Sequence, residues 1–68
     1  MKINANIFPQ LRALCWNRPD NTIVDGREAF DLYERNWRFV DEAALTPQER
    51  ALLDDLTEKY GHGVFLAA

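Results

Sequence analysis

Reactive and cross-linking side chains are scarce in this chain. Its 68 residues include one cysteine, Cys15, and one histidine, His62. A single cysteine excludes an intramolecular disulfide, on which small secreted domains usually depend. A structural zinc site needs about four Cys, His or carboxylate ligands. We therefore expect a cytoplasmic protein that holds no metal and no cofactor.

Long apolar runs and recognisable catalytic motifs are also absent. Residues 1–8 lack the continuous apolar stretch of a signal peptide, and nowhere do about 18 apolar residues follow one another, as a membrane span requires. No glycine-rich phosphate loop, HExxH or GxSxG pattern occurs. A nucleophile at Cys15 would require His62 beside it, and the helical pattern places Cys15 on a buried face. We expect one domain, residues 1–68, with no enzyme activity, no catalytic residues and no membrane contact.

Apolar and aromatic side chains are abundant for so short a chain. They make up 47% and 12% of the residues, well above the content of disordered segments. At this size about 60% of the surface of the unfolded chain can be buried, so each large apolar side chain matters for stability. The net charge of −3 opposes approach to a phosphate backbone. Generic nucleic-acid binding is therefore disfavoured.

Hydrophobic periodicity predicts a mostly α-helical fold, a small three-helix bundle. Pro9 precedes an apolar pattern of i, i+3, i+4 spacing, which predicts a first helix over residues 9–17. Residues 18–21 hold the proline, aspartate and asparagine typical of a turn, and residues 22–24 form a short extended connection. Residues 1–8 alternate apolar and polar side chains, which indicates either a short strand or an extended lead-in.

The second predicted helix begins at Asp25, because Asp25 and Glu28 form a capping pattern. Its apolar arc reaches Val40 and covers about half of the circumference, which makes it the central helix. A third helix over residues 47–60 follows from the threonine, proline and glutamate at its start and from Gly61 after its end. The apolar C-terminal tail, residues 64–66, is expected to fold back over the bundle.

Trp16 does not fit the helical pattern, because it lies roughly opposite the apolar face of the first helix. One interpretation is that the C-terminal tail or the turn after the helix covers its ring. The other is that Trp16 is an exposed anchor for a partner, since Trp and Arg are the residues most enriched among interface hot spots. Arg12 is then placed for a cation–π contact with the ring.

Asn36 falls in the middle of the apolar arc of the second helix. A buried amide without a hydrogen bond costs about 1 to 3 kcal/mol. Two interpretations remain open: the side chain ties down a loop backbone, or it is a polar pin at a helical interface such as a dimer seam. Phe39 and the C-terminal tail together leave an apolar patch, which is a second reason to keep a homodimer open.

Three acidic residues, Asp54, Asp55 and Glu58, project from the side of the third helix opposite its leucines. Such a stripe is usually a solvated surface, and Arg50 and Lys59 lie four residues from two of the acids and partly neutralise them. The functional interpretation is a contact with a basic surface on another protein through electrostatic complementarity.

These features favour a small protein-binding module, an adaptor, inhibitor or regulatory subunit that acts by occlusion or scaffolding on a partner protein whose identity the sequence does not reveal. The alternative is a small DNA-binding transcriptional regulator that uses the arginine-bearing face of the second helix, with Arg27, Arg35 and Arg38. The candidate partner-binding residues are Arg12, Trp16, Arg35, Arg38, Asp54, Asp55 and Glu58.

Overall fold

The protein is mostly α-helical, with one small sheet. The structure is a computed structural model that describes residues 1–65. Within these residues no helix is both long enough and apolar enough to cross a membrane. The elements follow one another as β1 (Lys2–Asn4), the 3₁₀ turn η1 (Ala5–Ile7), α1 (Pro9–Leu14), β2 (Ile23–Asp25), α2 (Gly26–Arg35), the 3₁₀ turns η2 (Trp37–Phe39) and η3 (Glu42–Ala44), and α3 (Pro47–Tyr60).

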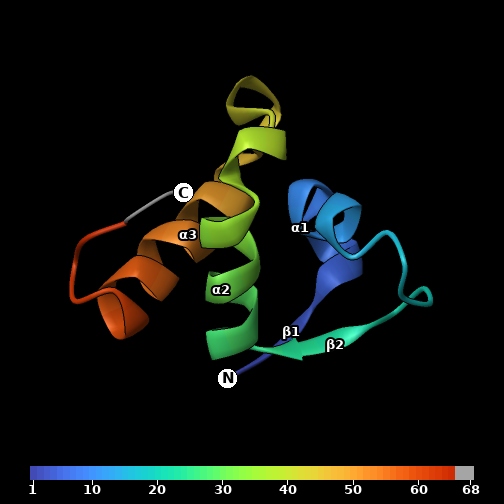
Figure 1. The fold of residues 1–68 in the computed structure, drawn as a ribbon, viewed down its shortest axis with the longest axis horizontal. Helices are drawn as coiled ribbons and strands as arrows, with labels where there is room; N and C mark the ends of the chain where they lie inside the picture. The colour runs from blue at the N-terminus through green and yellow to red at the C-terminus, as the bar shows by residue number, and fades with distance from the viewer. Residues whose placement is uncertain (66–68) are drawn as a thin grey trace.

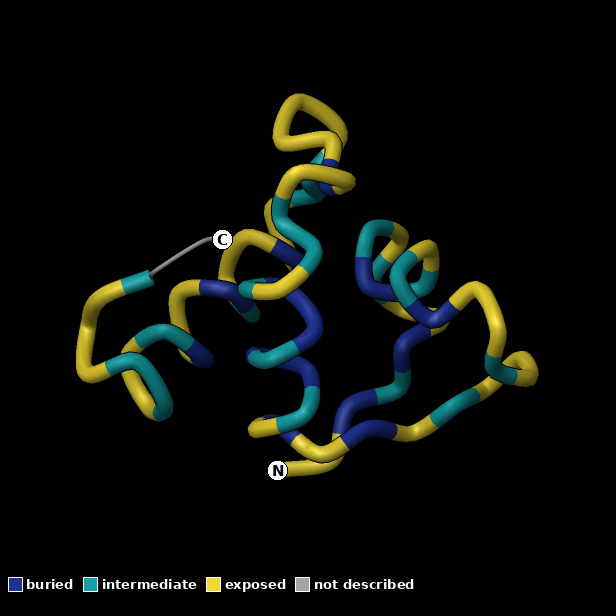
Figure 2. The backbone as a smooth tube through the Cα atoms, in the orientation of Figure 1, coloured by how far each residue is buried: buried dark blue, intermediate teal, exposed yellow. Residues whose placement is uncertain are grey.

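Helix α2 runs through the middle of the molecule, between α1 and α3, and the sheet lies beneath α1 and the start of α2 (Figure 1). Unbroken exposed runs lie in the loop before β2, in the tip that follows α2 and in the segment after α3 (Figure 2). The central position expected for the second helix is therefore observed. The core consists of Ile3, Ala5, Leu11, Cys15, Val24, Ala29, Phe30, Leu32, Tyr33, Val40, Leu53 and Leu56.

The N-terminal segment forms a strand, which is one of the two alternatives that the sequence leaves open. Strands β1 and β2 pair antiparallel, with Ile3 opposite Val24. Hydrogen bonds from the Ala5 N–H to the Thr22 carbonyl (3.0 Å) and from the Gly26 N–H to the Met1 carbonyl (2.9 Å) extend the pairing at both ends. The sheet therefore attaches the last part of the connection between α1 and α2, residues 22–26, to the start of the chain.

The first two helices are shorter than their apolar patterns predict. Helix α1 ends at Leu14 and not at residue 17, and α2 ends at Arg35 and not near Val40. Both the backbone N–H and the side-chain amide of Asn36 donate to the Leu32 carbonyl, at 3.2 and 2.9 Å, and the Asn36 backbone departs from helical geometry. Within residues 1–65 the Asn36 side chain therefore bonds the last turn of its own helix and not a loop backbone, and the homodimer interpretation stays a prediction.

Both ends of α3 lie where the sequence predicts them. The Thr46 hydroxyl accepts a hydrogen bond from the Glu49 N–H at 3.1 Å, and the helix ends at Tyr60. Gly61 is required there for space, because a Cβ atom at this position would lie 2.8 Å from Cζ of Phe30. Asp25 occupies the position before α2 but its side chain makes no cap hydrogen bond there, so the predicted side-chain cap is wrong.

Phe65 folds back over the helices, as expected for the C-terminal tail. Its ring meets Trp37 edge-on with centroids 4.8 Å apart and Phe30 with centroids 5.9 Å apart. Val64 is exposed, and Leu66, the third residue of the predicted tail, lies outside the described residues. Within the described part of the chain, the tail therefore packs on α2 and η2 through a single aromatic ring, that of Phe65.

Candidate functional site

Trp16 is the most exposed of the large apolar side chains in residues 1–65, with 81% of its surface open to solvent. The expectation that the tail or the turn covers its ring is wrong, because the ring of Phe65 packs on α2 and η2 instead. An indole is among the side chains that gain most from burial. Its exposure on so small a protein is therefore the feature that folding explains least.

The backbone around Trp16 is held by Arg12. The guanidinium donates to the carbonyls of Cys15 at 2.9 Å and Arg18 at 3.3 Å, and it pairs with the Asp20 carboxylate at 2.8 Å. The three contacts fix both sides of the turn that begins after α1. The predicted cation–π contact with Trp16 is replaced by these bonds, since Arg12 turns its guanidinium toward the backbone of the turn.

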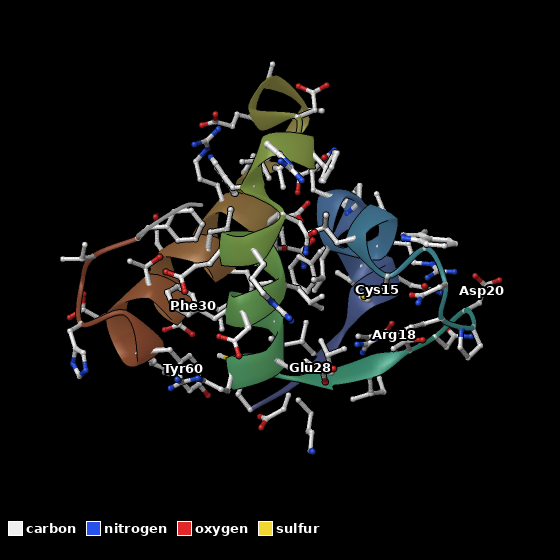
Figure 3. The ribbon with its side chains drawn as sticks, viewed as in Figure 1. Cys15, Arg18, Asp20, Glu28, Phe30 and Tyr60 are labelled. Carbon is white, nitrogen blue, oxygen red and sulfur yellow. The ribbon has the colours of Figure 1, made fainter. Side chains whose placement is uncertain are left out.

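Further contacts connect this turn to the rest of the fold. Arg18 and Glu28 point toward one another from the loop and from α2 (Figure 3), with nitrogen and oxygen 2.8 Å apart. The hydrogen bond to Glu28 raises the pKa of Arg18. Asn6 donates to the side-chain oxygen of Asn21 at 3.0 Å. We call residues 15–22, with Trp16 on their surface, the Trp16 turn.

The arginines on and just after α2 do not form a continuous basic stripe. Arg27 lies 3.9 Å from the Asp31 carboxylate, and Arg35 donates to the Asp31 carbonyl at 3.4 Å. Arg38 lies over the ring of exposed Phe39, 4.9 Å from its centroid. An acid therefore interrupts the face that the DNA-binding alternative requires.

The three acidic candidates of α3 differ in whether a cation pairs with them. Asp55 pairs with Lys59 at 3.6 Å, as expected. Arg50 forms no ion pair with Asp54 within residues 1–65, and its guanidinium donates instead to the Glu42 carbonyl at 3.4 Å. Asp54 and Glu58 remain exposed. The stripe thus includes one neutralised acid, Asp55, and two open ones.

Asp54 lines a groove that the sequence analysis did not find. The groove has a volume of about 190 Å³ and opens between α3 and the segment that follows α2. We call it the α3 groove. Its walls are Trp37, Leu45, Leu53 and Phe65, and its polar residues are Glu42, Arg50, Asp54 and Thr57.

A buried carboxylate joins the three helices. Glu49 of α3 is fully buried and accepts hydrogen bonds from the backbone N–H groups of Gln10 (3.0 Å) and Leu11 (2.9 Å) and from the Tyr33 hydroxyl (2.6 Å). Phe8, at the cap position of α1, has no side-chain acceptor to offer. Glu49 therefore caps α1 from another helix, where a negative charge near the first turn is favourable.

The remaining reactive side chains are not gathered at one place. Cys15 is fully buried, and this burial raises the pKa of its thiol, whereas His62 is exposed beyond the end of α3. Residues 1–65 contain no cluster of three or more His, Cys, Asp or Glu side chains suited to a metal ion.

Comparison with known protein families, with curated proteins and with solved structures finds no match to this chain.

Proposed function

We propose that this protein binds another protein and that Trp16 anchors the contact. The main support is the 81% exposure of an indole on a turn that Arg12 holds in place. Tryptophan is enriched among the residues whose truncation weakens protein complexes most. A turn that is fixed before binding also loses less conformational entropy when the complex forms.

In this proposal the three helices act as one bundle that presents the Trp16 turn to its partner. The protein is then an adaptor, inhibitor or regulatory subunit that acts by occlusion or scaffolding, in the cytoplasm, where a thiol such as Cys15 stays reduced. Arg12 has a positioning role, because its guanidinium is used by the turn itself. The arginines on and just after α2 and the acids of α3 lie on elements other than the Trp16 turn, and they stay candidate contacts of their own.

The test is affinity capture from native lysate with wild type and with Trp16→Ala as bait, followed by measurement of the affinity for the captured protein. We expect Trp16→Ala to bind about 30-fold more weakly, because truncation of a hot-spot residue costs about 2 kcal/mol or more. Its circular dichroism should match that of wild type.

A matched control removes another exposed ring, that of Phe39, which is 66% exposed. Phe39→Ala should keep the affinity of wild type if the Trp16 turn alone anchors the partner. Equal affinity of wild type and Trp16→Ala would contradict the proposal. Light scattering on the isolated protein shows whether the partner is a second copy, since a homodimer doubles the mass.

DNA binding through the α2 face is the weaker alternative. Arg27, Arg35 and Arg38 are exposed on or just after α2, but Asp31 lies between the first two. Counterion release by neutralised phosphates would be the main source of affinity. A gel-shift titration at low salt tests this alternative. If these arginines bind DNA, wild type should shift the DNA and the triple replacement of the arginines by glutamine should abolish the shift.

A further inference from the structure

The size of the α3 groove restricts what it can hold. Its volume of about 190 Å³ is below the roughly 300–1,000 Å³ of pockets that hold drug-sized ligands. A single large side chain delivered by a longer chain fits such a volume better than a whole small molecule does. The apolar walls, which include Trp37, Leu45 and Leu53, favour an aliphatic or aromatic side chain.

The walls of the α3 groove are held in place without a ligand. Phe65 meets Trp37 edge-on at 4.8 Å and Phe30 at 5.9 Å, which fixes one side. On the other side Leu53 is buried to 8% exposure, and the Thr57 hydroxyl donates to its carbonyl at 2.8 Å. An incoming side chain therefore meets a formed surface, and little ordering opposes its binding.

Two carboxylates and one guanidinium lie at the rim of the α3 groove, which gives the rim a net negative charge. Glu42 and Asp54 both line it, are exposed, and form no ion pair within the described residues. Arg50, the cation among the lining residues, is turned to the Glu42 carbonyl. Glu58, one helical turn after Asp54, adds another exposed carboxylate on α3. Opposite charges across an interface favour the correct partner and faster association, so the rim favours a cationic partner.

We infer that the α3 groove docks a segment of a partner protein that presents one leucine or aromatic side chain with lysine or arginine beside it. The apolar side chain enters between Trp37, Leu53 and Phe65, and the neighbouring cation meets Glu42 and Asp54. This inference rests on the proposed function, because it assumes a protein partner. It uses a surface other than the Trp16 turn, so the two are tested separately.

Trp37 supplies a signal for occupation of the groove. The chain holds two tryptophans, and in Trp16→Phe the indole of Trp37, in the groove wall, is the only one left. The probe is a short synthetic peptide with one leucine between lysines in a background of alanine and serine. Its binding should shift the emission of Trp37 to shorter wavelength in a saturable way, because the leucine displaces water from the indole.

Two further peptides separate the apolar contact from the charge contact. Replacing the leucine of the probe with alanine should weaken binding at least about tenfold, since most of the apolar burial is lost. Replacing its lysines with glutamate should remove measurable binding, because like charges then face each other across the rim. Higher salt should weaken binding of the lysine probe, since the contributing charges are exposed.

Two pairs of substitutions test the rim in the Trp16→Phe background. Glu42→Gln with Asp54→Asn should weaken binding of the probe about tenfold, because each exposed ion pair contributes up to roughly fivefold. The matched control, Asp25→Asn with Asp31→Asn, removes the same charge from acids that do not line the groove. It should bind the probe as tightly as the parent.

Three results would overturn the inference: no saturable shift with the leucine and lysine probe, equal weakening in both double variants, or a shift of Trp37 emission with protein concentration alone. The last result would assign the groove to a second copy of the chain. Failure of the peptide titration leaves the Trp16 proposal intact, because that proposal is measured by loss of a captured partner in Trp16→Ala. Conversely, a specific peptide titration supports the groove whatever the Trp16→Ala capture shows.

Discussion

Glu49 and Trp16 reverse the usual distribution of side chains between core and surface. The carboxylate of Glu49 is fully buried, and the indole of Trp16 is 81% exposed, whereas charged groups are normally outside and large apolar groups inside. The buried charge is compensated by three hydrogen bonds from α1 and α2. The exposed indole has no comparable compensation within the described residues.

This difference separates a residue needed for folding from one available for binding. The fold stabilises the buried charge of Glu49, because this carboxylate accepts hydrogen bonds from the amide groups that Phe8 leaves uncapped at the start of α1. Within residues 1–65 no contact buries the indole of Trp16, although Arg12 holds the backbone of the surrounding turn. Stability should therefore be sensitive to Glu49 and insensitive to Trp16.

The largest effect is expected for Glu49→Ala. The substitution leaves the N–H groups of Gln10 and Leu11 and the hydroxyl of Tyr33 buried without their acceptor. We expect the free energy of unfolding to fall by about 3 to 5 kcal/mol, as for other broken buried polar pairs. Urea unfolding followed by circular dichroism measures it, with Gln48→Ala, an exposed neighbour on α3, as control. A loss under about 1 kcal/mol would remove the structural role of Glu49.

Tyr33→Phe is expected to have the next largest effect. The hydroxyl donates to Glu49 at 2.6 Å and the side chain is fully buried. Because the substitution removes one donor and leaves the two backbone donors of α1, we expect a loss of about 1.5 to 3 kcal/mol, typical of a hydrogen bond to a charged group. The same urea experiment applies. A loss equal to that of Glu49→Ala would mean that the α1 amides contribute nothing.

Alkaline pH should weaken the same junction. Burial, followed by the hydrogen bond to Glu49, raises the pKa of Tyr33 above its usual value. The unfolded chain therefore releases this proton near pH 10 while the folded chain keeps it. The stability linked to Tyr33 is complete below about pH 10 and is lost as the pH rises above it, by up to about 1.4 kcal/mol per pH unit.

The measurement for this prediction is the free energy of unfolding between neutral pH and the alkaline range, in wild type and in Tyr33→Phe. Wild type should lose stability more steeply above about pH 10. The raised pKa of Cys15 acts in the same direction in both proteins and cancels in the comparison. Parallel curves would show that Tyr33 ionises equally in the folded and unfolded chains.

Signals between residues that are close in the sequence predict both ends of α3. The end of α2 and the side-chain contacts of Glu49 depend instead on the three-dimensional structure, and the sequence did not predict them. Thr46 and Gly61 mark the ends of α3 because their hydrogen bonds, to Glu49 and to Thr57, join residues three and four positions apart, although Gly61 also leaves the space that Phe30 needs. The end of α2 depends on the amide of Asn36, a residue that helical spacing alone places within the apolar arc. The capping pattern predicts the hydrogen bond from the Glu49 N–H to Thr46. It does not predict that the carboxylate of Glu49 turns to α1. Helical spacing gave a hint of this, because Glu49 lies on the same face as Leu53.

Of the two candidate binding surfaces, the sequence predicts the Trp16 turn and not the α3 groove. The position of Trp16 off the apolar face could be found from the period of one helix, and its exposure agrees with that pattern. The α3 groove could not be found, because its walls come from η2, α3 and the residues after α3, and their meeting depends on the early end of α2. Asp54 was singled out for its charge, without the apolar surface beside it.

The smallest effect, and the most direct test of the contrast between the two residues, is the free energy of unfolding of Trp16→Ala measured by urea denaturation. Because the ring is almost fully in water, the value should stay within about 0.5 kcal/mol of wild type. A loss of about 2 kcal/mol or more would show that the indole is part of the core in solution and would contradict its assignment as a binding anchor.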